Sequence, residues 1–195
     1  MYLDFSQIDI PEFPSKDDAM EWALSFTGIR MWHATRMLDS EKESLTRIGL
    51  KLPNKTNLDA KLIDWIKCNK SWYTKEVDCV VKKQELNRGE PPAVYAVLLK
   101  SDLSFMGIDH YAEYGSEYWQ YLMRVLSNSG YGVGREELIE YGSSYLVGLQ
   151  VAWKSLDPAE VTYIVDAVFE NDAHNSGIAI FRDVPASEIV VVEKC

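Results

Sequence analysis

The sequence predicts a single α+β domain. Segments with helical periodicity and segments with strand-like alternation are interspersed without the regular order of a βαβ fold. The 195 residues suffice for one buried core, and 47% hydrophobic with 26% charged residues is close to the globular average. We expect residues 1–28 to form an N-terminal segment and helix, and residues 29–195 to form the core of the domain.

The first part of the chain predicts a helix, a strand and a second helix. Ser15 is the expected N-cap of a short helix with acidic residues in its first turn, and Gly28 ends it. Residues 29–36 alternate between two faces, as a strand does. Residues 39–40 are expected to cap the second helix, which stops at Gly49.

The middle of the chain is mainly helical. Residues 57–88 predict two helices, and the nearly all-apolar run 93–99 predicts a central strand buried on both faces. Ser116 is the expected cap of a strongly amphipathic helix. Residues 129–134 predict a flexible connector, and 135–141 a short helix.

The last part predicts three strands and one helix. Residues 145–153 form the first strand, and Asp157 caps a helix that opens with proline. The strands 178–181 and 189–192 follow, separated by a turn at 184–187.

Charge and composition exclude several classes of function. Twenty basic and thirty acidic residues give a net charge of −10, which repels phosphate backbones and anionic lipid. We therefore expect neither generic nucleic-acid binding nor a membrane partner. The N-terminus lacks the features of a signal peptide, and Cys68, Cys79 and Cys195 lack the spacing of a disulfide framework or a zinc site. A cytoplasmic protein with reduced thiols and no metal is expected.

The first candidate site is the strand Trp32-His33-Ala34-Thr35-Arg36, followed by a short helix and Ile48-Gly49-Leu50. His33 and Thr35 share one face of an otherwise apolar strand, and buried polar side chains need partners. Spacing alone allows two interpretations. The pair is either a core histidine bonded to backbone beside a surface threonine, or a pair of ligand contacts.

This string resembles the opening motif of the ADP-ribosyltransferase superfamily, in the branch that includes the poly(ADP-ribose) polymerases and diphtheria-type toxins. The resemblance implies an ADP-ribosyltransferase-like split antiparallel sheet with flanking helices, and NAD as a substrate. By this resemblance, His33 bonds a ribose hydroxyl of NAD, on the adenosine or the nicotinamide side, and serves as a catalytic residue. Thr35 supports the ribose, and the main chain of Ala34 clamps the nicotinamide amide. The family has glycine where this chain has Ala34.

The second candidate site lies between the apolar strand and the helix capped by Ser116. The family places an aromatic residue there that stacks on nicotinamide, and Tyr114 or Tyr111 matches it. Ser116 is then a further NAD contact, and Glu117 the first candidate catalytic acid. Both also fit a plain helix cap and a first-turn acid, which the helix dipole favours.

The third family element is a glutamate near the start of a late strand, which stabilises the cationic ribose. This chain has Gly177, Ile178 and Ala179 at the expected positions. An acid must therefore come from elsewhere, with Glu117 first and Glu170 second. The acid is needed for an electrostatic reason, because breaking the glycosidic bond of NAD leaves positive charge on the ribose.

Two further signals are less specific. The Gly-x-Gly-x-Gly string at 130–134 follows a helix rather than a strand, so it predicts a loop or a lid and not a dinucleotide fold. The lysine-rich stretch 51–83 is either a solvated helical face or a docking site for a phosphate-bearing ligand or an acidic partner.

The leading hypothesis is transfer of ADP-ribose from NAD to a macromolecular acceptor. Small members of the family often act as toxins or effectors, which implies a partner protein that neutralises them. One alternative is a related module that binds NAD or ADP-ribose without transferring it. The other is an acidic interaction or immunity protein in which His33 is structural.

Overall fold

The computed structural model describes residues 1–86, 91–105, 109–174 and 177–195. Within them lies an open six-stranded sheet flanked by helices, which confirms the predicted α+β class. Its order is β5-β3-β2-β4-β6, all antiparallel, and β1 adds to β2 in parallel. The strands are β1 (Tyr2–Leu3), β2 (Gly28–Met37), β3 (Val94–Val97), β4 (Ser143–Ala152), β5 (Gly177–Ile180) and β6 (Ile189–Lys194).

The helices follow the sequence pattern in most places. They are α1 (Lys16–Leu24), α2 (Asp39–Ile48), α3 (Lys55–Asn69), α4 (Lys75–Lys82), α5 (Asp102–Phe105), α6 (Asp109–Tyr114), α7 (Glu117–Leu126) and α8 (Pro158–Phe169). A π-helical turn, η1 (Ser127–Tyr131), extends α7, and a 3₁₀ helix, η2 (Arg135–Glu140), precedes β4.

Side-chain caps explain where α1 and α8 begin. Ser15 accepts a hydrogen bond from the Asp18 amide at the start of α1, and Asp157 accepts one from the Ala159 amide at the start of α8. The second helix differs from expectation. It begins at Asp39 itself, and the Leu38 amide at the cap position donates to the Glu41 carboxylate at 2.9 Å.

Three other expectations need correction. The strand predicted at 93–99 covers only Val94–Val97, and it is not buried on both faces, since Tyr95 is 55% exposed. The expected connector after α7 begins as the π-helical turn of η1. The helices α5 and α6 were not predicted, and the expected chain break at 89–92 falls partly outside the described residues.

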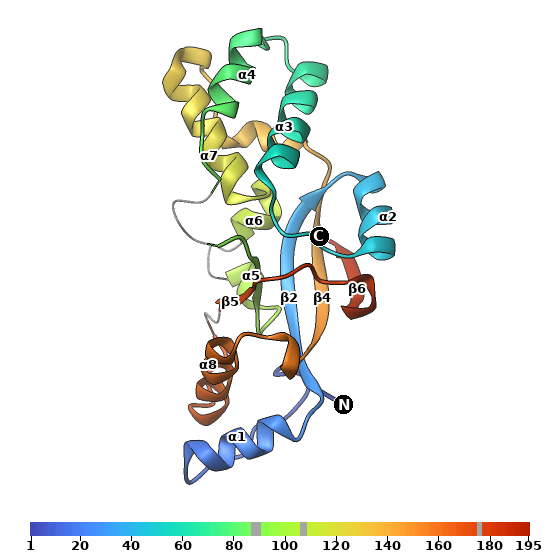
Figure 1. Cartoon of the computed structure of the whole chain (residues 1–195), viewed down its shortest axis with the longest axis vertical. Helices are drawn as coiled ribbons and strands as arrows, with labels where there is room; N and C mark the ends of the chain where they lie inside the picture. The colour runs from blue at the N-terminus through green and yellow to red at the C-terminus, as the bar shows by residue number, and fades with distance from the viewer. Residues whose placement is uncertain (87–90, 106–108, 175–176) are drawn as a thin grey trace.

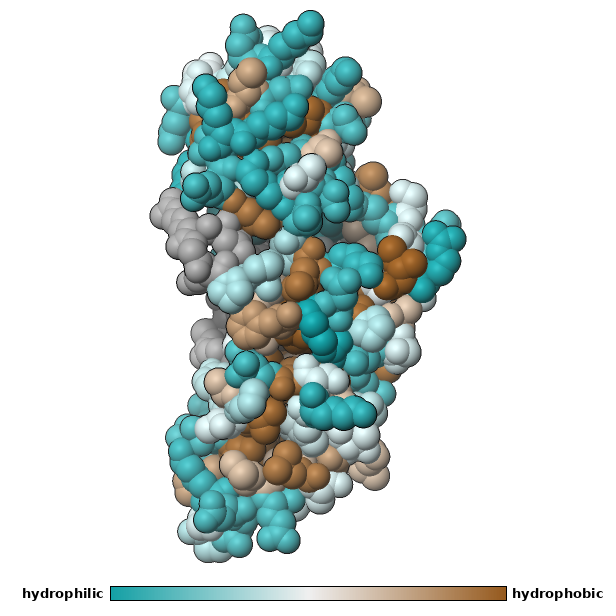
Figure 2. Space-filling view, viewed as in Figure 1, coloured by the Kyte–Doolittle hydropathy of each residue, from teal (hydrophilic) through white to brown (hydrophobic). Residues whose placement is uncertain are grey.

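The molecule is elongated, and its two ends have different cores (Figure 1). The long strands β2 and β4 run through the middle, with α1 and α8 at one end and α3, α4 and α7 at the other. The sheet core is formed by buried side chains of the strands with α1 and α8. The helical core is formed by α3, α4, α7 and η2. Figure 2 shows mainly hydrophilic residues over the visible surface of the helical end.

The outer strand β6 contains a β-bulge. Gly148 of β4 lies opposite Val191 and Leu149 lies opposite Ile189, so Val190 has no residue opposite it. The extra residue is 42% exposed. Such a bulge bends the strand and increases its local twist.

Candidate functional site

The strand β2 places His33 and Thr35 as the alternation predicts. It pairs with β4 from Gly28↔Ala152 to Met37↔Ser143, with His33 opposite Val147 and Thr35 opposite Tyr145. Their cross-strand neighbours Val147 and Tyr145 belong to the sheet core. His33 and Thr35 are therefore half-buried side chains on the core-facing side of the sheet.

The sheet is nearly split on the other side of β2. Among the described residues, the β2–β3 ladder has one pair, Trp32↔Val97, whereas β2 and β4 pair along their whole length. Past this pair, Ala34 has no partner on β3 among the described residues; it lies opposite Leu146 of β4 and is 8% exposed. An edge with main-chain N–H and C=O groups outside a ladder can bind a planar amide.

His33 lies at this split. Its Nδ1 is 2.7 Å from the main-chain oxygen of Tyr95 on β3. A carbonyl only accepts, so Nδ1 carries the proton and Nε2 is the acceptor nitrogen. Burial lowers the pKa of His33, and the bond to Tyr95 opposes this effect. The imidazole is therefore neutral at pH 7, with an Nε2 that can accept a hydrogen bond from a hydroxyl.

The residues of the second candidate site lie together at the junction of α6 and α7. Ser116 accepts a hydrogen bond from the Trp119 amide at 3.3 Å, so it is the cap of α7, and Glu117 is the exposed first residue of that helix. The Arg135 guanidinium lies 4.6 Å from the centre of the Tyr114 ring. The side chain of Tyr111, the other aromatic candidate, lies outside what the structure describes.

Arg36 joins this junction to the sheet. Its guanidinium donates to the main-chain oxygens of Glu113 at 3.1 Å and Gly142 at 2.9 Å, and to the Ser144 hydroxyl at 2.9 Å. A further bond goes to the oxygen of Ile139. One side chain thus ties α6, η2 and β4 to β2. The sequence pattern did not predict this role, although an arginine at an alternating position of an apolar strand was a visible signal.

The two candidate sites meet β2 from opposite faces. A Cβ on Gly115 would lie 3.6 Å from the Cβ of Arg36, so the α6–α7 junction covers the even-numbered face of β2. His33 and Thr35 are odd-numbered and point to the other face. The structure therefore brings His33, Ala34 and Thr35 together, and Tyr114, Ser116 and Glu117 together, with the plane of β2 between the two sets of side chains.

The late strand β5 lies two strands away from β2, with β3 between them. Gly177 of β5 is opposite Val97, which in turn is opposite Trp32, so β5 reaches the level of the split. A Cβ on Gly177 would meet nothing within 4 Å. Glu170, the second candidate acid, is the exposed residue that follows α8.

The lysine-rich stretch is largely neutralised by carboxylates. Five of its lysines form ion pairs, which are Lys51–Asp183, Lys55–Asp59, Lys61–Glu41, Lys82–Asp78 and Lys70 with both Glu137 and Glu140. This pairing favours the solvated-face interpretation over a docking site for phosphate.

The described residues contain no group of three or more histidine, cysteine or carboxylate side chains arranged to hold a metal ion. Among these residues, no helix is long and apolar enough to span a membrane. Comparison of the chain with protein-family models, curated proteins and solved structures finds no match.

Proposed function

We propose that this protein binds NAD at the β2 edge beside the split of the sheet and transfers its ADP-ribosyl group to a macromolecular acceptor. One observation carries the proposal. The hydrogen bond from His33 to the carbonyl of Tyr95 presents a neutral imidazole beside main chain that lies outside the β2–β3 ladder.

The proposed contacts follow from the atoms at this edge. The N–H and C=O of Ala34 bind the carboxamide of nicotinamide, Nε2 of His33 accepts a ribose hydroxyl, and Thr35 lies two residues along on the same face. The glycosidic C–N bond then breaks, nicotinamide leaves as a neutral molecule, and the acceptor nucleophile bonds to the ribose carbon as it loses a proton. A carboxylate stabilises the cationic ribose during this step.

Glu117 is the proposed carboxylate. It lies on the α6–α7 junction, on the opposite face of β2 from His33. The reacting ribose therefore has to sit at the strand edge, where both faces are within reach. This requirement makes the position of the α6–α7 junction, fixed by Arg36, a condition of activity.

A related module that binds NAD without transferring it is the second candidate. The glycine and alanine at the start of β5 favour it, because that strand supplies no carboxylate to the ribose. Such a module needs the β2 edge alone and makes no use of Glu117.

Purified protein incubated with adenylate-labelled NAD and candidate acceptor fractions separates these functions. Covalent label together with released nicotinamide supports transfer, and saturable binding without release supports the binding module. If neither occurs, His33 is structural and both proposals fail.

Glu117→Gln tests the acid, with Glu76→Gln as the matched control because Glu76 is the corresponding exposed first-turn acid of α4. We expect Glu117→Gln to lower turnover by about 100-fold or more while the control stays unchanged. Equal turnover in both variants would remove Glu117 and direct attention to Glu170.

A further inference from the structure

His174 and Asp102 form a contact between two distant segments. His174 lies in the loop that joins α8 to β5, and Asp102 is the first residue of α5. The Nδ1 atom of His174 is 2.8 Å from Oδ1 of Asp102, whose side chain is only 1% exposed. Since a buried carboxylate is costly without compensating donors or cations, the imidazole is in a position to stabilise Asp102.

Local geometry fixes both sides of the contact. Asn171 adopts the left-handed conformation (φ 51°), and the His174 amide donates to the Asp172 carboxylate at 3.0 Å. On the other side, the Asp102 amide donates to the oxygen of Leu99 at 3.2 Å. The imidazole therefore ties one ordered turn to another.

The surroundings of the imidazole are acidic and open to solvent. His174 is 64% exposed and lines an open hollow of about 310 Å³. Asp9 of the N-terminal segment lines the same hollow, and Asp172 lies in the same loop as His174. Lys100, in the turn between β3 and α5, is paired with Glu193. The charged groups of these elements thus favour a proton on His174.

We propose that His174 and Asp102 form a proton-dependent clamp, which holds the start of α5 against the loop before β5 when the imidazole is charged and loosens when it is neutral. The end of α6 is held by Arg36 through the oxygen of Glu113. The clamp is therefore one attachment of α5, which also packs through the buried side chain of Leu103. It operates whether or not the protein uses NAD.

The direction of the pH effect follows from linkage. The hydrogen bond and charge of Asp102 raise the pKa of His174, with a smaller contribution from Asp172. The unfolded pKa is about 6.5. The stabilisation is therefore fully present below about pH 6.5 and is lost as the pH rises through the raised folded pKa.

Amide hydrogen exchange of residues 99–103 and 171–174 tests the clamp. After correction for intrinsic rates, we expect protection in the wild type to fall by about threefold or more between about pH 6 and pH 9. His174→Gln keeps a side-chain donor without a titrating charge and should lose this pH response. Lys16→Gln, which breaks the exposed Lys16–Asp166 pair between α1 and α8, is the control and should retain it.

Two results would overturn the clamp. One is an NMR titration that places the pKa of His174 at or below about 6.5. The other is a pH response in His174→Gln equal to that of the wild type. Asp102→Asn removes the charge of the carboxylate and should also lose the pH response. If Asp102→Asn fails to fold, His174→Gln alone still decides the test.

Discussion

The two cores of this protein are built from different chemistry. In the sheet core, Met31, Val147, Leu149 and Ile178 are fully or almost fully buried and pack as plain hydrocarbon. In the helical core, the large side chains are often aromatic and carry polar atoms with fixed partners. Trp119 donates its indole N–H to the oxygen of Leu58 at 3.1 Å, which joins α7 to α3.

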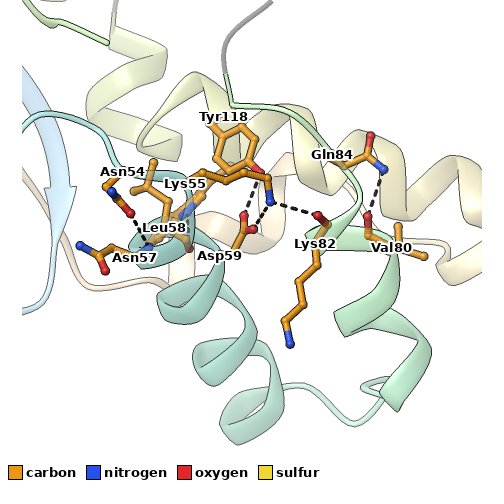
Figure 3. A network of polar contacts seen from close by, with 10 residues as sticks. Asn54, Lys55, Asn57, Leu58, Asp59, Val80, Lys82, Gln84 and Tyr118 are labelled. Carbon is orange, nitrogen blue, oxygen red and sulfur yellow. Dashed lines mark hydrogen bonds and ion pairs between the residues drawn. The ribbon is translucent and has the colours of Figure 1, made fainter.

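A buried carboxylate lies at the centre of the helical core (Figure 3). Asp59 of α3 accepts a hydrogen bond from the Tyr118 hydroxyl of α7 at 2.7 Å and pairs with Lys55, which also donates to the main-chain oxygen of Lys82, the last residue of α4. The network thus links α7 to the consecutive helices α3 and α4. The sheet end therefore depends mainly on filled volume, with Tyr145 bonded to Asp39 as a polar exception, whereas the helical end also depends on a network of satisfied polar groups.

The largest expected effect comes from removing volume at either end. Leu149 of β4 and Leu122 of α7 are both fully buried. We expect Leu149→Ala and Leu122→Ala each to lower the free energy of unfolding by about 3 kcal/mol, measured by urea denaturation. Amide hydrogen exchange should show the loss of protection mainly at the end of the molecule that carries the substitution. A uniform loss in both variants would show that the two cores unfold as one unit.

Asp59→Ala should cost slightly less, about 2 to 3 kcal/mol, because it leaves the Tyr118 hydroxyl and the Lys55 ammonium without their carboxylate. Asp64→Ala, which removes an exposed acid from the same helix, is the control and should stay within about 0.5 kcal/mol of the wild type. Thermal denaturation of both variants measures the difference. Equal stability would mean that the network adds nothing to the helical core.

Arg36→Met should lower the free energy of unfolding by about 2 kcal/mol, since it leaves the carbonyls of Glu113 and Gly142 without a donor. The exposed Arg47→Met of α2 is the control. Arg36→Met also tests how the sheet core and the helical core are connected, because Arg36 joins the sheet to elements beside the helical core. Increased exchange in residues 112–119 is expected, and unchanged exchange there would contradict the positioning role.

The smallest expected effect appears at high pH. Burial and the bond to Asp59 raise the pKa of Tyr118, so the neutral phenol is favoured in the folded state. This stabilisation is present below about pH 10 and is lost as the pH rises through the folded pKa. Tyr118→Phe should cost about 1 kcal/mol at neutral pH and reduce the loss of stability above about pH 10, as followed by circular dichroism. An unchanged alkaline slope would assign the loss to other tyrosines.

Elements with local signals could be predicted from the sequence. Ser15, Ser116 and Asp157 cap helices through bonds to amides two or three residues away, so nearby residues suffice to place those starts. The alternation of residues 29–36 likewise predicted that His33 and Thr35 share a face. These features depend on short-range geometry alone.

Features that depend on partners distant in the chain could not be predicted from the sequence. The carbonyl that binds His33 belongs to Tyr95, 62 residues away, and the carbonyl of Glu113 in α6 accepts its hydrogen bond from Arg36, 77 residues away. The position of Glu117 relative to His33 depends on which face of β2 the α6–α7 junction covers. No periodicity in the chain encodes that choice.

The extra residue at Val190 has a consequence for how copies of this protein behave together. An outer strand with four successive apolar residues is a template on which another chain could add. The kink at Val190 interrupts the even row of amides and carbonyls that such an addition requires. Deleting Val190 would straighten this edge of the sheet. Concentrated solutions of the deletion variant should then form fibrous or sheet-like assemblies under conditions in which the unmodified protein stays dispersed.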